Sequence, residues 1–356
     1  MLRLNLTPRP NTLNNLLHLI VASSDRFSAQ HLFNAARGGA RLDPCSFSIM
    51  IGGHCNAGEP NAALELLAEF EQSGGAPNVV MYTTLIDGCF KNGNLGEAQK
   101  LFVKMKAIGL VPNEFTYTVM INGCFRNGSR DDGLRLYEEM KNIGVSPNLF
   151  TYNSMISEFC KAEDLVSAFK MFDEMGERGL LPNVVTYNTL IGGFCRKKKM
   201  REAEKLLKRM RSEGLRPSVV TFNIVIDGYC KAGRLPNALA MLNQMKTDGY
   251  SPTTATYNVL FSGFSKAGDL VGIATTYREM KERGIAPSKV TYTILIDAFA
   301  RENDMERAFE MYRSMERAGL ETDVYTFGVL IRGLCSDGNM KDALKLFKSM
   351  VEEKGL

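Results

Sequence analysis

Proline residues recur in this chain at a fixed interval of 35 residues. Seven of them share the phase, namely Pro77, Pro112, Pro147, Pro182, Pro217, Pro252 and Pro287. Aromatic residues keep the same period at Phe47, Tyr82, Tyr117, Tyr152, Tyr187, Phe222, Tyr257, Tyr292 and Phe327. A period of this length is typical of tandem repeats, in which each unit packs only on its neighbours. The 356 residues are therefore expected to form a repeat array and not one compact core.

This frame divides the chain into an N-terminal segment, residues 1–43, and nine units. The units are 44–78, 79–113, 114–148, 149–183, 184–218, 219–253, 254–288, 289–323 and an incomplete 324–356. In the N-terminal segment, Arg3 and Arg9 occur without an acidic residue before Asp25, which is typical of an organelle transit peptide. The alternative is a first helix in a degenerate capping repeat, because residues 13–22 carry apolar side chains at helical spacing.

Each unit is predicted to contain two helices. Apolar side chains within residues 187–194 follow the i, i+3, i+4, i+7 spacing of one helix face, although the Val-Thr-Tyr opening has high β propensity. A turn such as residues 231–234 ends the first helix, and a second amphipathic helix follows, as in residues 97–105. Gly109 and Pro112 then prevent its continuation. One hairpin cannot bury its apolar face alone, so the fold class is predicted to be an all-α solenoid of 35-residue helix-turn-helix repeats.

Composition narrows the range of functions. The formal net charge is only +4, so any binding of nucleic acid must depend on local placement of charge. Cys55, Cys160, Cys195, Cys230 and Cys335 share one position of the repeat, which favours buried thiols in a reducing compartment over disulfides or a metal cluster. Apolar stretches are too short to span a bilayer. No catalytic or metal-binding motif occurs, so we expect no enzyme, no cofactor and no small-molecule substrate.

Two columns of small polar residues run through the repeats. Position 5 holds Ser48, Thr83, Thr118, Asn153, Asn188, Asn223, Asn258 and Thr293, while the ninth unit has Gly328. The last position, 35, holds Asn78, Asn113, Asn148, Asn183, Ser218, Thr253, Ser288 and Asp323. Hydroxyl and amide groups can probe the edge of a base, but residues of these types after a proline also suit helix N-caps. We call the residues at positions 5 and 35 of one unit a polar pair.

Two further columns accompany the polar pairs. Position 2 holds mostly apolar residues, namely Val80, Phe115, Phe150, Val185, Val220 and Val290 with Cys45, Ala255 and Tyr325. They could contact bases or pack within the hairpin. Position 13 holds Lys91, Arg126, Lys161, Arg196, Lys231, Lys266 and Arg301. These cations could complement the C-terminal helix dipole, but seven in phase favour a line of phosphate contacts.

The segment 184–195, followed by Glu202 and Ala203 and ending at residues 213–217, resembles the pentatricopeptide repeat family of organellar RNA-binding proteins. The resemblance covers residues 44–356, and the uniform unit length is similar to that of the P subfamily. Tetratricopeptide repeats differ in their period of 34 and in a Trp that this chain lacks. The resemblance implies a right-handed superhelix that binds single-stranded RNA, in which each polar pair reads one base and position 2 sandwiches it.

Applied to the eight polar pairs, the family pattern implies a target of approximately 5′-AAAYCYYG-3′, where Y is a pyrimidine and the N-terminal repeat lies at the 5′ end. The first three pairs resemble adenine readers, Asn153 with Asn183 a pyrimidine reader, and Asn188 with Ser218 a cytosine reader. The next two pairs imply pyrimidines. Thr293 with Asp323 resembles a guanine reader, and Gly328 leaves the ninth unit without one.

The resemblance also implies a role in organellar RNA processing, such as intron splicing or transcript stabilisation. Mitochondria are the first expectation for the location and chloroplasts the alternative, with other RNA-processing proteins as further partners. The competing hypothesis is a helical-repeat scaffold for protein–protein interaction. Binding a protein would not require the polar pairs and the cations to keep strict phase, so the two hypotheses differ over these columns.

Overall fold

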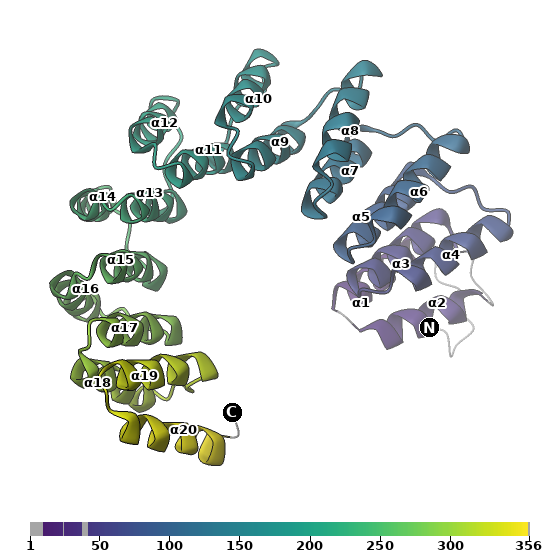
Figure 1. The fold of residues 1–356 in the computed structure, drawn as a ribbon. Coiled ribbons are helices and arrows are strands. Elements are labelled where there is room, and N and C mark those ends of the chain that lie inside the picture. The colour runs from purple at the N-terminus through teal and green to yellow at the C-terminus, as the bar shows by residue number, and fades with distance from the viewer. Residues whose placement is uncertain (1–9, 24, 38–41, 355–356) are drawn as a thin grey trace. The chain divides into compact units, whose positions relative to one another are not determined.

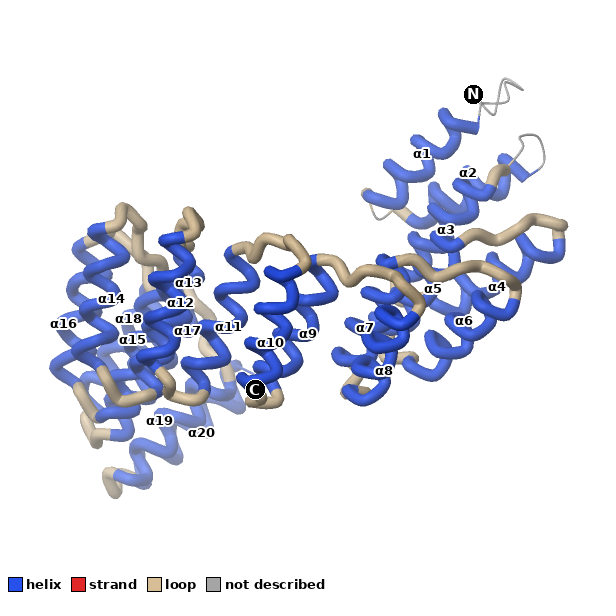
Figure 2. Tube along the Cα trace, turned by 90° about the horizontal axis from the view of Figure 1, so that it is seen from above, coloured by secondary structure: helices blue, strands red, loops and turns tan. Residues whose placement is uncertain are grey.

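The computed structural model describes residues 10–23, 25–37 and 42–354, in which every regular element is an α-helix (Figures 1 and 2). The first helices of the hairpins are α1 (Pro10–Ala22), α3 (Pro44–Asn56), α5 (Val79–Lys91), α7 (Glu114–Arg126), α9 (Leu149–Lys161), α11 (Val184–Arg196), α13 (Val219–Lys231), α15 (Thr254–Ala267), α17 (Lys289–Arg301) and α19 (Val324–Ser336). The second helices are α2 (Arg26–Arg37), α4 (Pro60–Gln72), α6 (Leu95–Ala107), α8 (Arg130–Asn142), α10 (Leu165–Glu177), α12 (Met200–Ser212), α14 (Leu235–Thr247), α16 (Leu270–Glu282), α18 (Met305–Arg317) and α20 (Met340–Lys354). The predicted all-α organisation in helix-turn-helix repeats is confirmed.

The β-branched opening of each unit is helical because a cap fixes the start of the helix. Asn113 has an extended backbone, and its side chain accepts a hydrogen bond from the backbone N–H of Thr116 at 2.9 Å. Such a cap satisfies one of the amide groups that have no partner within the helix. Local capping and tertiary packing together therefore outweigh the β propensity of the Val-Thr-Tyr sequence.

The turn between the two helices needs a left-handed residue at position 15 of the unit. Gly233 takes this conformation with φ +70°, as a residue without Cβ does readily. Glu163, Lys198 and Asn303 occupy the same place with φ between 56° and 60°. A left-handed backbone costs about 1–2 kcal/mol in a residue with a Cβ, so these turns are held by the packing of the helices on either side.

Contacts between Cα atoms divide the chain into two compact units, one of residues 1–158 with 175–180 and the other of residues 159–174 with 181–356. In the first, α1, α3, α5 and α7 pack side by side, and α4 and α6 each contact the first helix of the following hairpin. In the second, α11, α13, α15, α17 and α19 form the equivalent layer. The core lies between neighbouring first helices and their second helices, where Tyr82, Leu85 and Ile86 are fully buried.

Seven of the nine units have a glycine at position 10 of the first helix, and the contact that it makes with the preceding first helix is close. A Cβ added to Gly88 would lie 2.3 Å from Sγ of Cys55 on the preceding helix, so α3 and α5 could not pack as closely with any other residue at this place. Cys55, Cys160, Cys195 and Cys230 are buried as predicted. Cys335 is exposed, which contradicts the prediction for its column, because no following first helix covers it in this structure.

The N-terminal segment contributes a hairpin to the structure. Its first helix, α1, packs against α3 and buries Leu13 and Leu17 completely. Residues 1–9 and Ser24, which belong to the predicted transit peptide, lie outside the described residues.

Candidate nucleic-acid interface

In several units, the residues of a polar pair are linked through a threonine of the next unit. The Thr83 and Thr116 hydroxyl groups lie 2.8 Å apart, and Thr116 donates a hydrogen bond to Oδ1 of Asn113 at 3.0 Å. In the following unit, Thr151 lies 2.7 Å from Thr118 and 3.1 Å from Oδ1 of its own cap, Asn148. One buried hydroxyl group therefore positions both side chains of a polar pair.

This linking threonine stands at position 3, a column that sequence reasoning treated only as part of a β-branched opening. The column holds Thr116, Thr151, Thr186, Thr221, Thr256, Thr291 and Thr326, all fully buried. A polar residue repeated at a buried position needs a constant partner, so the strict phase was a usable signal. The partner itself could not be read from the sequence, because it lies 33 residues away on the preceding first helix.

All eight residues at position 35 are N-caps of the helix that follows. Each accepts a hydrogen bond from the backbone N–H three residues later, at distances from 2.9 Å for Asp323 to 3.4 Å for Thr253. The prediction that residues at position 35 suit helix N-caps is therefore confirmed. Because an asparagine cap uses Oδ1, its amide Nδ2 stays available as a donor.

The asparagines at position 5 differ in their hydrogen bonding. Oδ1 of Asn258 accepts a hydrogen bond from Thr291 at 2.8 Å. The corresponding oxygen atoms of Asn188 and Asn223 are buried and have no hydrogen-bond partner among the described residues. A buried acceptor without a partner costs about 1–3 kcal/mol, so these two side chains would gain from a ligand that donates an N–H group.

One polar pair lacks the linking hydroxyl group. Ser48 and Asn78 have Met81 at the linking position, and Met81 is fully buried. Ser48 instead donates a hydrogen bond to the carbonyl oxygen of Pro44 in its own helix at 2.9 Å. This unit therefore holds its polar pair less firmly than the second and third units hold theirs.

The side chains at position 2 are exposed and do not pack within the hairpin. Exposed fractions are 60% for Val80, 62% for Phe115 and 73% for Phe150, and Val185, Val220 and Val290 are also exposed. A row of exposed apolar side chains at regular intervals is a surface that a ligand could cover. Of the two interpretations of this column, packing within the hairpin is therefore wrong.

The cations at position 13 are all exposed, and several already have partners in the protein. Lys91, Lys231 and Arg301 form ion pairs of 2.6–2.7 Å with the aspartate one helical turn earlier. Arg196 donates a hydrogen bond to the carbonyl oxygen of Cys160 at the end of the preceding first helix. Exposed ion pairs contribute about 0–1 kcal/mol, so a phosphate group could replace the aspartates at little cost.

Asp323 is the one ionisable residue in the eight polar pairs, and its surroundings favour the charged form. Hydrogen bonding from the Thr326 backbone N–H lowers the pKa of Asp323 to about 2, against the opposing effect of burial and with a further contribution from Lys289. The Lys289 ammonium group lies 3.0 Å from Oδ2. Asp323 is therefore a carboxylate at neutral pH, with Oδ1 bound by the backbone N–H of Thr326 and Oδ2 by the partly exposed Lys289.

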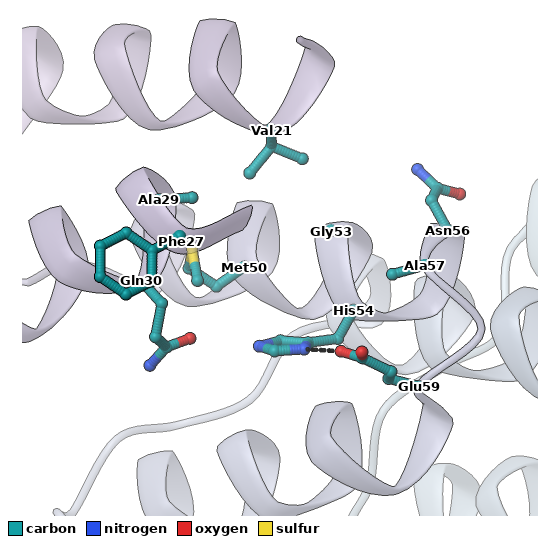
Figure 3. Close-up of a pocket in the computed structure, with 10 residues that line it drawn as sticks. All are labelled: Val21, Phe27, Ala29, Gln30, Met50, Gly53, His54, Asn56, Ala57 and Glu59. Carbon is teal, nitrogen blue, oxygen red and sulfur yellow. Dashed lines mark hydrogen bonds and ion pairs between the residues drawn. The ribbon is translucent and has the colours of Figure 1, made fainter. Parts of the chain in front are cut away.

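A cavity of about 440 Å³ lies beside α1, α2 and α3, away from the polar pairs. Figure 3 shows His54 and Glu59 at its edge, joined by a contact of 3.0 Å between Nδ1 and Oε2. The remaining lining is mostly apolar and includes Val21, Phe27 and Met50. Within the described ranges, no three His, Cys, Asp or Glu side chains gather as a metal site would require. No helix in the described part of the chain could cross a membrane.

The sequence matches two repeat-family profiles. The PPR repeat family matches residues 77–126, 119–161, 147–196, 182–231, 217–266, 252–301 and 290–336. The PPR repeat matches residues 45–75 and 325–354. Together these segments cover most of the chain and follow the nine units.

Two plant proteins and two solved structures are similar to this chain. Two pentatricopeptide repeat-containing proteins of Arabidopsis thaliana are 49% and 34% identical over 77 residues, and the second is named mitochondrial. These matches cover 22% and 21% of this chain but only 14% and 19% of the plant proteins. The crystal structure of PPR10 from maize is 25% identical, with a TM-score of 0.58 over 96% of this chain and 59% of that one. Yeast Rmd9p in complex with a 16-nucleotide target RNA shares the fold, with 11% identity and a TM-score of 0.52 over 94% of this chain and 87% of that one.

Proposed function

Since the chain belongs to the pentatricopeptide repeat family, we propose that it binds single-stranded RNA and reads one base with the polar pair of each unit. The eight pairs from Ser48 and Asn78 to Thr293 and Asp323 would read approximately 5′-AAAYCYYG-3′. The observation that carries the proposal is the linked geometry of three of these pairs, Thr83 with Asn113, Thr118 with Asn148 and Thr293 with Asp323, in which a buried threonine hydroxyl lies between the position-5 side chain and the cap.

Capping alone does not explain this arrangement. A cap needs only position 35, whereas position 5 lies on the preceding first helix and contributes nothing to the new helix terminus. Asn188 and Asn223 even leave a buried acceptor without a partner, which a purely structural column would avoid. If the amide turned toward the surface, an N–H group of a base would supply the missing donor, for example the exocyclic amine of cytosine at Asn188.

The neighbouring columns supply the rest of a single-strand binding surface. Exposed apolar side chains at position 2, such as Val80, Phe115 and Phe150, offer faces for base contact, which is worth about 1–3 kcal/mol per base for aromatic residues. The exposed cations at position 13 offer phosphate contacts. Because the net charge is small, these contacts would guide the strand without attracting nucleic acids indiscriminately.

Binding of labelled AAACCCCG and of a scrambled RNA at graded salt concentrations tests the proposal. Seven phosphate contacts on a single strand predict a slope of about −5 in a plot of log K against log salt. We expect clear preference for the designed sequence. Failure to bind at low salt, or equal affinity for the scrambled RNA, would contradict the proposal and favour the protein-scaffold hypothesis.

A pair of variants tests the phosphate column separately. Arg126→Gln removes an exposed cation at position 13 and should reduce the magnitude of the salt slope by about 0.7. Lys100→Gln removes an exposed cation from the second helix α6, outside the proposed surface, and should leave the slope unchanged. If both variants changed the salt slope equally, the slope would depend on the net charge of the protein and not on contacts between position 13 and phosphate groups.

We further propose that the bound RNA is an organellar transcript and that binding serves its processing, for example in intron splicing or stabilisation. The plant relatives support an organelle, and the name of one of them favours the mitochondrion over the chloroplast. Crosslinking in fractionated mitochondria and chloroplasts, followed by sequencing of the bound RNA, would identify both compartment and transcript. Enrichment of cytosolic RNA alone would contradict this part of the proposal.

A further inference from the structure

The first hairpin, α1 with α2, lies outside the segments that match the repeat profiles, yet it carries the linked geometry of a polar pair. Asn14 is the fifth residue of α1, Asp43 is the N-cap of α3, and Ser46 is the third residue of α3. These are the places that Thr118, Asn148 and Thr151 occupy three hairpins later.

Asn14, Asp43 and Ser46 are joined by hydrogen bonds between every two of them. Nδ2 of Asn14 donates to both oxygen atoms of Asp43, at 3.1 Å and 3.0 Å. The Ser46 hydroxyl group lies 2.6 Å from Oδ1 of Asn14 and 3.0 Å from Oδ1 of Asp43. The Ser46 backbone N–H closes the cap at 2.8 Å. Ser46 thus links Asn14 to Asp43 as Thr151 links Thr118 to Asn148.

The packing of α1 on α3 independently gives the same register. A Cβ added to Gly53 would lie 3.1 Å from Cγ1 of Val21, and Figure 3 shows Val21 and Gly53 on facing helices. Val21 is the twelfth residue of α1, as Cys55 is the twelfth residue of α3 and packs on Gly88. The first hairpin is therefore stacked as a repeat and is not a separate cap.

The interval between the paired residues explains why the 35-residue frame misses this unit. Asn14 and Asp43 are 29 residues apart, whereas Ser48 and Asn78 are 30 residues apart. Counting back from residue 44 in steps of 35 therefore places position 5 at Leu13, which is fully buried and apolar.

We propose that the first hairpin is a further base-reading unit, which binds the nucleotide directly 5′ of AAAYCYYG and selects uracil or guanine through Asn14 and Asp43. The proposal rests on the proposed function and on its strand polarity. An ionised aspartate is only an acceptor, so the base must present an N–H group at the ring nitrogen of its pairing edge. Uracil and guanine do so, whereas the corresponding nitrogen atoms of adenine and cytosine are acceptors and would face the carboxylate.

The flanking residues set the expected strength of this site. The second residue of α1 is Asn11 and that of α3 is Cys45, both exposed, so neither offers the aromatic face that Phe115 and Phe150 provide further along the array. The helix also lacks a cation at its thirteenth residue, which is Ala22. The site should therefore add base selectivity at one nucleotide but contribute little to the overall affinity for RNA.

The test compares four nine-nucleotide RNAs, in which U, G, A or C precedes AAACCCCG, with the full-length protein. We expect the U and G forms to bind about tenfold more tightly than the A and C forms, as a hydrogen bond to a charged group allows. Asp43→Asn keeps an effective cap and should abolish this preference. Asp269→Asn makes the same change at the cap of α16, outside the polar pairs, and should leave the preference intact.

The outcomes separate the two proposals. Equal binding of all four RNAs, with selectivity retained at the last base, would overturn the assignment of the first hairpin and leave the proposed function standing. Preference for U and G that survives in Asp43→Asn would also overturn it, because another group would then be responsible. If no form of the RNA binds, both proposals are wrong.

Discussion

The hydroxyl groups of Thr83 and Thr116 lie 2.8 Å apart, although 33 residues of chain separate the two threonines. The Thr83 hydroxyl group also lies 2.7 Å from the carbonyl oxygen of Val79, and the Thr116 hydroxyl group lies 3.0 Å from Oδ1 of Asn113, the cap of its own helix, so the two hydroxyl protons are shared among three contacts. The contact therefore joins two consecutive first helices through side chains that are buried but border the proposed base-reading surface. Stability and specificity should depend on the same hydroxyl group.

Replacement of Thr116 tests this link. Thr116→Val keeps the shape of the side chain but removes the hydroxyl group, and it should destabilise the protein by about 1 kcal/mol. Selectivity at the second base of the target should fall as well, because Thr83 and Asn113 lose their common partner. Urea unfolding and binding of RNAs changed at that base measure the two effects.

The control for this variant is Thr189→Val. Thr189 donates only to the carbonyl oxygen of Val185 in its own helix and lies outside the polar pairs. If both variants lower selectivity equally, the link does not position the polar pair.

The converse variant adds a link where the protein lacks one. Met81→Thr places a hydroxyl group beside Ser48 and Asn78 and should sharpen selectivity at the first base of AAAYCYYG.

The glycines at position 10 give a prediction about stability. Gly88→Ala places a Cβ 2.3 Å from Sγ and 2.5 Å from Cβ of Cys55, so the helices must separate, at a cost of about 1–3 kcal/mol. Gly96→Ala, on α6 with open space around the new Cβ, should instead stabilise the protein by up to about 1 kcal/mol through helix propensity. Thermal unfolding of the two variants should shift in opposite directions, and shifts of the same sign would refute the contact argument.

The carboxyl group of Asp323 makes stability depend on pH in a defined window. Its folded-state pKa of about 2 lies below the ordinary 3.8, because the Thr326 backbone N–H and Lys289 favour the ionised form. Its contribution is therefore fully present above the ordinary value and is lost as the pH falls through about 2. The stability difference between the wild type and Asp323→Asn, which retains a cap, should shrink over this window. A difference that stays constant from pH 5 to pH 2 would contradict the assignment.

The free cysteines should divide into two groups when they react with a thiol reagent. Burial raises the pKa of Cys55, Cys195 and Cys230 to about 12, and Cys89, Cys124 and Cys160 are buried as well, with pKa values of about 11. Cys45 and Cys335 are exposed and should react first in the native protein. Fast reaction of more than two thiols under native conditions would contradict the packing.

RNA should protect only one of the exposed thiols. Cys45 stands at position 2, where we propose base contact, whereas Cys335 lies at the end of α19, away from that column. Saturating RNA should therefore slow the reaction of Cys45 and leave that of Cys335 unchanged, as mass spectrometry of the modified protein can show. Equal protection of both thiols would indicate a conformational change of the protein on binding RNA. If neither thiol were protected, the RNA would not cover position 2 of the first unit.

Much of the fold follows from short-range signals. Proline before a small polar residue marks the start of seven first helices, and a residue in a left-handed turn separates the two helices of a unit, because capping and turn formation involve neighbours within a few residues. The frame found by period alone nevertheless missed Asn14 and Asp43, whose spacing differs by one residue from that of Ser48 and Asn78. A difference of one residue in spacing therefore hides a unit from periodicity although Asn14 and Asp43 are still linked through Ser46.

By itself, the sequence determined that this protein is an array of helical hairpins, which columns could meet a ligand, and where the first helix of each of the nine units begins. Only the tertiary structure decided that position 2 faces solvent, that Cys335 is uncovered, and that a threonine 33 residues away links each of several polar pairs. The physical reason is distance along the chain. Caps and turns are local interactions, whereas burial and these hydrogen bonds arise only when one hairpin stacks on the next.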